Sequence, residues 1–326
     1  MPYPAFLSAL LPYRKWILRL LAVVVMLVFI YQFVGLARRI DWVRFGESIV
    51  RPGNGWKLVV VLLLMPLNWL LEARKWQLLL DAFVRWPFRR VWRATLAGVS
   101  LSAATPNRIG EIGGRLLLAR RGEWAAVTAA SLLGSVCQWV AFLLLAWPAL
   151  IYTLDALPGG WLGGLPLLAL LPLGPLALVI VYLGGKPLIR WLLDVIERRF
   201  GRDLDVLRSA LPNVTLLLLL RSSVYACLRF VVYCTQLYLL LGFFGLSLPL
   251  LWGLAGIAAI YLIQAGLPLP PGLNLVTRTE LGLLLWSVDA EGAIAVLAAY
   301  TALFGVNVLL PALPGYWLIV RKNKLS

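Results

Sequence analysis

Residues 91–118 read VWRATLAGVSLSAATPNRIGEIGGRLLL. An apolar stretch is interrupted by Ala-Thr-Pro-Asn-Arg-Ile-Gly-Glu, from Ala104 to Glu111, and a second apolar stretch follows. Proline removes a backbone donor and clashes with the preceding helical turn, so one straight helix cannot run through this break. Residues 250–288 repeat the arrangement around Gly-Leu-Pro-Leu-Pro-Pro-Gly-Leu-Asn, from Gly266 to Asn274. We therefore predict two broken, re-entrant helical hairpins, at 91–118 and 250–288.

The rest of the chain is too apolar for a water-soluble protein. Of its 326 residues, 62% are hydrophobic and 13% are charged, whereas a soluble domain is about half apolar and a quarter charged. A spanning helix needs roughly 20 mostly apolar residues. Six stretches qualify: 16–37, 58–79, 125–152, 165–183, 214–241 and 293–320. We predict an all-α polytopic membrane protein with six spanning helices plus the two hairpins, forming a single domain over residues 1–326 of a multi-pass protein in the cell inner (plasma) membrane.

The positions of Lys and Arg predict the orientation, because cytoplasmic loops carry an excess of both. If both hairpins turn back inside the membrane, the basic stretches with Arg115, Arg120 and Arg121 and with residues 186–208 face the cytoplasm. The outer connections 152–164, 243–249 and 287–292 then contain no Lys or Arg, and the basic first outer loop is the exception. We predict cytoplasmic N- and C-termini. Residues 186–210 alternate apolar and basic side chains, which is typical of an interfacial helix on the cytoplasmic face.

A weak internal repeat pairs the two hairpins. Each follows a spanning stretch, so we predict two related halves, about 57–155 and 212–320. The first hairpin would enter from the cytoplasm and the second from outside, with their tips meeting near the midplane. Two interrupted apolar segments in opposite orientation are typical of a transporter site, because irregular backbone at that depth needs protein or a water-filled cavity around it. The alternative is that both breaks are kinks packed against neighbouring helices.

Charged and amide side chains inside the apolar stretches are the candidate ligand contacts. A charge at the bilayer centre costs about 2.5 to 3.5 kcal/mol and usually faces a cavity or a partner. Arg229 lies about 22 Å along its span at about 1.5 Å per residue, too deep to reach a surface easily, whereas Arg221 is shallow enough to snorkel. The candidate substrate-binding residues are Asn68, Glu72, Arg108, Glu111, Arg229, Arg278 and Glu280.

These candidates have both functional and structural interpretations. Arginine suits phosphate because its planar fork donates two hydrogen bonds at once, and Asn68 and Glu72, four residues apart, share a helix face. The structural alternatives are a pair between Arg108 and Glu111, and an ordinary interfacial pair between Glu72 and Lys75.

The composition excludes several other chemistries. The chain has no His, so it has no Ser-His-Asp or Cys-His system and no His-ligated metal. Its cysteines, Cys137, Cys227 and Cys234, lie in apolar runs without metal-ligand spacing, which favours a packing role. We expect no metal and no cofactor. The net charge of +16 is better explained by anionic lipid headgroups than by nucleic acid, because no soluble basic domain is present.

Three motifs carry a family resemblance. Thr-Pro-Asn-Arg-Ile-Gly-Glu followed by Gly-Gly-Arg-Leu-Leu-Leu (105–118) resembles the signature of the lysylphosphatidylglycerol synthase transmembrane, or flippase-like, family. Residues 68–76 and 268–280 resemble its other recurrent stretches. The resemblance covers essentially the whole chain and implies the lipid-translocating part of such proteins. It also implies a stand-alone member that lacks the aminoacyl-transferase domain, so lysyl transfer is not expected.

We therefore expect a transporter, not an enzyme, that moves an anionic phospholipid or a polyprenyl-phosphate-linked lipid between leaflets. Its headgroup would meet Arg108, Arg229 and Arg278, and Glu111 and Glu280 are candidate proton carriers. The expected partners are membrane lipids, and a homo-oligomer is left open. One alternative is a membrane glycosyltransferase with a polyprenyl-phosphate donor, since Asp41 lies in the first outer loop. The other is a non-transporting membrane scaffold.

Overall fold

The computed structural model describes residues 53–103, 109–156, 167–179, 211–267, 271–286 and 290–325, together with positions 43, 47, 194, 208 and 209. Every regular element in these ranges is a helix. Several predictions fall outside the described residues: the span 16–37, nearly all of the interfacial helix 186–210, both hairpin tips, Asp41 and Arg108.

Four helical segments are long and apolar enough to cross a membrane: Gly55–Leu80, Arg121–Asp155, Leu216–Phe243 and Gly292–Ile319. They confirm four of the predicted spans, those at 58–79, 125–152, 214–241 and 293–320. The predicted span 165–183 is described only over 167–179, where the short 3-10 helix η3 (Leu167–Leu170) and a turn of two residues come before the next helix. That part of the chain therefore shows no continuous spanning helix.

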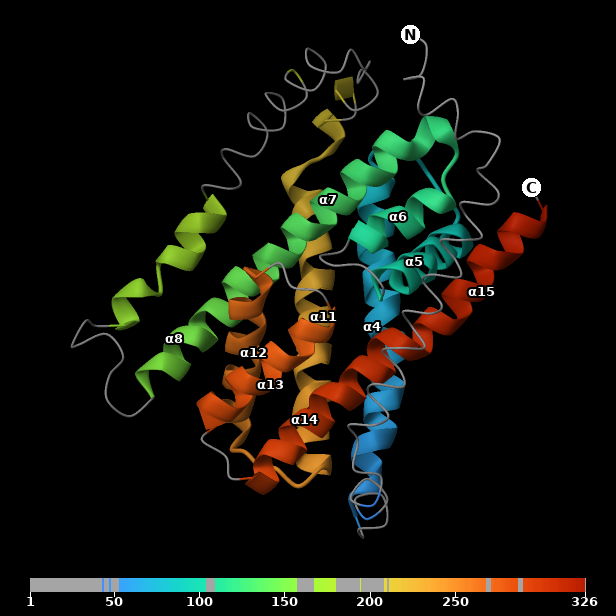
Figure 1. Cartoon of the computed structure of the whole chain (residues 1–326). Coiled ribbons are helices and arrows are strands. Elements are labelled where there is room, and N and C mark those ends of the chain that lie inside the picture. Colours follow the sequence, from blue (N-terminus) through green and yellow to red (C-terminus); the bar gives the residue numbers. More distant parts are fainter. Residues whose placement is uncertain are drawn as a thin grey trace.

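Helices α4 (Gly55–Leu80) and α11 (Leu216–Phe243) form the centre of the molecule and run antiparallel (Figure 1). At one end, Lys57 Nζ donates a hydrogen bond to the Gly242 carbonyl oxygen over 2.9 Å. At the other end, Asn213 Nδ2 donates to the Ala82 carbonyl oxygen over 3.2 Å. Each helix is followed directly by a hairpin, so the two hairpins begin at opposite ends of this central pair.

The first hairpin consists of α5 (Phe88–Ser102) and α6 (Ile109–Leu117), and the second of α12 (Leu250–Ala265) and α13 (Pro271–Trp286). These helices have 15, 9, 16 and 16 residues, fewer than the roughly 20 that a crossing needs. Glycines allow the two helices of each hairpin to pack closely. A Cβ added at Gly98 would lie 2.9 Å from the Glu111 carbonyl oxygen, and one at Gly256 would lie 2.7 Å from the Leu285 side chain. Both interrupted segments are therefore paired short helices.

A long interrupted helix follows each hairpin. In the first half, α7 (Trp124–Ala141) continues through the π-helical η2 (Phe142–Ala146) into α8 (Trp147–Asp155). In the second half, α14 (Ala290–Phe304) continues through the π-helical η5 (Gly305–Leu309) into α15 (Leu310–Leu325). Helix α8 packs on α12, and α15 packs on α5. The order of elements in residues 55–155 thus recurs in 216–325, and each half contacts the hairpin of the other.

Apolar side chains fill the interior and also cover the outside. One buried cluster joins helices of both halves and includes Trp76, Leu237 and Val296. Leu63 and Leu217, on α4 and α11, are more than half exposed, as expected for surfaces that face lipid. Cys137 and Cys234 are buried within the apolar cluster, and Cys227 is half-buried against it. The thiols therefore pack among apolar side chains, as the sequence predicts.

Candidate functional site

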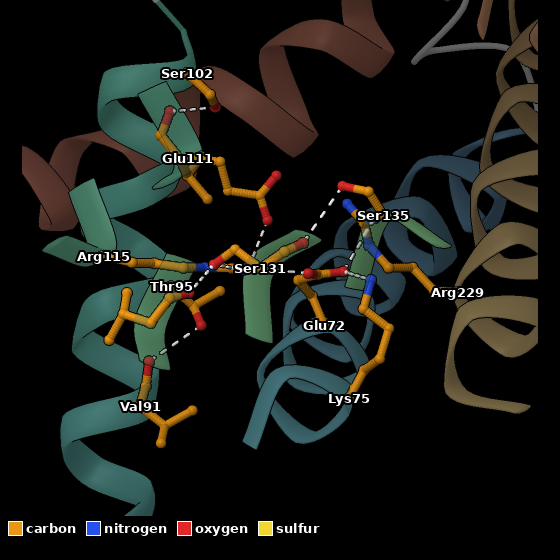
Figure 2. Close-up of polar contacts among 12 residues, drawn as sticks. Glu72, Lys75, Val91, Thr95, Ser102, Glu111, Arg115, Ser131, Ser135 and Arg229 are labelled. Carbon is orange, nitrogen blue, oxygen red and sulfur yellow. Dashed lines mark hydrogen bonds and ion pairs between the residues drawn. The ribbon is translucent and has the colours of Figure 1, made fainter. Parts of the chain in front are cut away.

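A buried ionic cluster is centred on Glu72 of α4 (Figure 2). The Glu72 side chain is 3% exposed. Its Oε2 atom lies 2.6 Å from Lys75 Nζ and 3.2 Å from Arg229 Nη1 of α11, and its Oε1 atom lies 3.0 Å from Arg115 Nη2 of α6. One carboxylate therefore connects the two central helices with the first hairpin. The Glu72–Lys75 pair is buried and is not an ordinary interfacial pair.

Arg115 attaches the first hairpin to the rest of the molecule. Its Nη2 atom also lies 2.5 Å from Glu111 Oε1, and its Nη1 atom donates to Ser131 Oγ of α7 over 3.1 Å. The guanidinium lies 4.5 Å from the ring centroid of Trp76. The Arg115 side chain is only 2% exposed, so it is an interior contact, whereas the membrane side of the basic stretch with Arg120 and Arg121 stays a prediction. The spacing of Glu111 and Arg115, four residues apart on one helix, is the sequence signal that would have found this pair.

A cavity of about 180 Å³ lies beside this cluster. Its walls come from α7, η2 and α11 on one side and from the second hairpin on the other. The lining residues are Gln138, Phe142, Arg229, Phe230, Tyr233, Tyr261 and Arg278. Arg229 therefore belongs to both sites, because it pairs with Glu72 and also lines the cavity.

Aromatic rings support both arginines of the cavity. The Arg278 guanidinium lies 4.7 Å from the Tyr261 ring centroid, and the Arg229 guanidinium lies 5.7 Å from that of Tyr233. The two tyrosine rings are 5.9 Å apart and nearly perpendicular, at 89°. Cations are attracted to ring faces within about 6 Å. Arg278 Nε also donates a hydrogen bond to Gln264 Oε1. The pair of tyrosines thus links the two cations along the cavity.

Polar atoms at the cavity are buried without hydrogen-bond partners. They are Gln138 Oε1, Arg229 Nε and the Tyr261 hydroxyl. Buried polar groups are nearly always hydrogen-bonded, so these atoms are free to hydrogen-bond with water or a polar ligand. The described residues that line it include no carboxylate. Over the described part of the chain, no three His, Cys, Asp or Glu side chains gather in a way that could hold a metal ion.

A second polar connection lies elsewhere, in the contact between α4, α11 and η5. Asn68 Nδ2 donates to Asn307 Oδ1 and Asn307 Nδ2 donates to Gln236 Oε1, both over 3.0 Å. Gln236 Nε2 then donates to the Val61 carbonyl oxygen over 2.9 Å. All three amide side chains are fully buried. Asn68 is therefore part of this amide chain and does not line the cavity. The sequence analysis missed Gln236 and Asn307. An isolated amide within an apolar span indicates a buried polar contact and could have identified both.

The other predicted residues divide between the two sites and the surface. Glu72 and Glu111 lie in the ionic cluster, Arg278 lines the cavity, and Arg229 belongs to both. Glu280 is exposed on α13, outside the cavity. Arg221 is exposed near the beginning of α11, in agreement with a side chain that snorkels. Arg108 lies outside the described residues.

Comparison with known proteins identifies the family. The family model described as "Lysylphosphatidylglycerol synthase TM region" matches residues 16–310. This range is most of the chain and includes both hairpins. No curated protein matches the chain. The family match agrees with the four apolar helices and with the three motifs quoted above. The chain is a membrane protein and belongs to the lysylphosphatidylglycerol synthase transmembrane family.

Proposed function

We propose that this protein is a lipid transporter of the inner membrane, which binds an anionic headgroup in the Arg229/Arg278 cavity and passes it between leaflets. The cavity carries the proposal: it presents two guanidiniums and further unpartnered polar atoms, and its described lining holds no carboxylate. Arg229 shares the Glu72 carboxylate with two other cations, and the half-buried Arg278 has a neutral hydrogen-bond acceptor, Gln264, so an anion is the favoured ligand. Phosphate matches the planar fork of arginine. The substrate is therefore an anionic phospholipid or a polyprenyl-phosphate-linked lipid.

The arrangement of the two halves supports transport in preference to catalysis. The hairpins begin at opposite ends of the antiparallel α4 and α11, and repeats in opposite orientation are typical of transporters that alternate access to a fixed site. We infer that the headgroup reaches the cavity from one leaflet or the other as the hairpins change position, while the acyl chains remain in lipid. The first hairpin would open to the cytoplasm and the second to the outside.

Arg229 links occupancy of the cavity to the first hairpin. It shares the Glu72 carboxylate with Lys75 and Arg115. When a phosphate attracts Arg229, Glu72 keeps two other cations, so weakening this contact costs less than breaking an isolated buried pair. Arg115 and the hairpin that it belongs to then respond to the weakened contact between Glu72 and Arg229. Binding in the cavity is thus coupled to α6.

The proposal is tested by reconstituting the purified protein into liposomes with acyl-labelled phosphatidylglycerol or phosphatidylcholine and following the label of the inner leaflet as it reaches the outer one. We expect faster movement of phosphatidylglycerol. Arg229→Gln and Arg278→Gln should each slow it about tenfold, since a hydrogen bond to a charged group contributes about 1.5 to 3 kcal/mol. Arg221→Gln, an exposed site on the same helix as Arg229, is the matched control and should keep the wild-type rate.

Arg278→Gln is the decisive variant, because Arg278 makes no contact with the Glu72 carboxylate and its loss leaves the ionic cluster intact. A folded Arg278→Gln protein, judged by its unfolding midpoint and gel-filtration profile, that moves phosphatidylglycerol at the wild-type rate would overturn the proposal.

A further inference from the structure

The ionic cluster and the cavity together hold more positive than negative charge. The cations are Lys75, Arg115, Arg229 and Arg278, and the carboxylates are Glu72 and Glu111. Two positive charges are therefore in excess among the described residues of this region. The hydrogen-bond acceptor of Arg278, Gln264, is neutral. The remaining carboxylates of the described spans and hairpins lie at helix ends or on the surface: Asp81, Glu123, Asp155, Glu280 and Glu291.

Such an excess favours a ligand of matching charge beside Arg229 and Arg278, because removing an ion from water is costly unless it is paired. A phosphodiester headgroup carries one negative charge. A phosphate monoester has a second pKa of about 6 and carries about −1.5 to −2 at pH 7. Resting on the proposed function, we infer that the substrate is a lipid that ends in a phosphate monoester, and that the site selects it over phosphodiester lipids.

The cavity geometry supports the same choice. A monoester presents three terminal oxygens as acceptors, and three residues that line the cavity carry donor groups: Arg229, Arg278 and Tyr261, whose buried hydroxyl has no hydrogen-bond partner. They come from three helices, α11, α13 and α12, so two central elements of the fold, the α11 span and the second hairpin, both contribute to the cavity. In a diester, one of these oxygens carries a substituent instead and accepts no hydrogen bond from these donors as a charged oxygen would.

The inference is tested by comparing dioctanoyl phosphatidic acid with dioctanoyl phosphatidylmethanol. The methyl cap removes the second charge with the smallest possible change in size. Titration calorimetry on the detergent-solubilised full chain at pH 7.5 should show at least tenfold tighter binding of phosphatidic acid. At pH 5, where the monoester binds its second proton, the preference should fall to less than threefold. Arg278→Gln should reduce the preference at pH 7.5, and Arg221→Gln should retain it.

A polyprenyl phosphate in the same titration distinguishes the two sources of a monoester. Tighter binding than phosphatidic acid assigns the site to polyprenyl lipids, and weaker binding assigns it to glycerolipids. Equal affinity for phosphatidic acid and phosphatidylmethanol would overturn the inference, yet the proposed function would stand if both lipids cross the bilayer in proteoliposomes. A monoester preference without any transport would instead support the inference about the ligand and overturn the transporter proposal.

Discussion

Arg229 touches both polar regions of the interior: its Nη1 atom lies 3.2 Å from the Glu72 carboxylate, and its side chain also lines the cavity. This span residue, predicted from the sequence to bind the substrate, thus connects the cavity through Glu72 to Arg115 of the first hairpin.

Replacing Glu72 should destabilise the protein more than any cavity variant. Glu72→Gln leaves Lys75, Arg115 and Arg229 without their shared carboxylate. Removing one partner from a buried ionic network costs about 3 to 5 kcal/mol, so we expect a clear drop in the thermal unfolding midpoint in detergent. Glu280→Gln, on the exposed face of α13, is the matched carboxylate control. Equal unfolding midpoints for the two variants would contradict the structural importance of the cluster.

The first hairpin should be sensitive to a single methyl group. A Cβ at Gly114 would collide with the Ala97 carbonyl oxygen, whereas a Cβ at the neighbouring Gly113 would lie 3.8 Å from the nearest atom, in the Leu101 side chain. Overpacking costs about 1 to 3 kcal/mol, so Gly114→Ala should lower the unfolding midpoint and slow lipid movement. Gly113→Ala should behave like the wild type. If the two variants cannot be told apart, α5 and α6 do not pack as closely as described.

The amide chain should contribute stability without setting the preference for a headgroup. Asn68→Ala and Asn307→Ala each break the same hydrogen bond, so a double-mutant cycle on unfolding free energy should give a coupling of about 0.5 to 3 kcal/mol. The ratio of phosphatidylglycerol to phosphatidylcholine movement should stay at the wild-type value in Asn68→Ala. A changed ratio would instead assign Asn68 to the ligand site, as the sequence analysis proposed.

The two ends of the central helix pair should be accessible from opposite sides of the membrane. Trp56 and Asn213 are exposed near the beginnings of α4 and α11, which run antiparallel. In intact cells, a membrane-impermeant maleimide should label Trp56→Cys and should label Asn213→Cys only after the membrane is opened. The wild type, with Cys137 and Cys234 buried, serves as the background. Labelling of both positions from outside would contradict the antiparallel pair, and the reverse pattern would invert the predicted orientation.

The sequence predicts the hairpins well because a proline interrupts a helix at its own position, whatever the rest of the fold is. The breaks place the pairs at 91–118 and 250–288, and the observed helices cover 88–117 and 250–286. The depth of Arg229 similarly follows from a rise of about 1.5 Å per residue. Both inferences need only neighbouring residues and no knowledge of tertiary packing.

The cavity and the burial of Arg115 are not predictable in this way. The cavity combines Gln138 with Tyr261 and Arg278, which are distant in sequence. Helices that are apolar on all sides give no pattern that tells which face meets a neighbour. A count of basic residues groups Arg115 with Arg120 and Arg121 in one basic stretch. Such a count does not include the direction in which each side chain points, so it cannot show that Arg115 is buried.

The packing of α8 on α12 and of α15 on α5 has a mechanical consequence. Ser100 Oγ donates a hydrogen bond to the Ala312 carbonyl oxygen over 2.7 Å, so the first hairpin is fastened to the last helix of the chain. Neither half can tilt as an independent block without separating one of these contacts. In the proposed transport cycle, a movement of one hairpin would therefore be transmitted across the whole bundle to the other half.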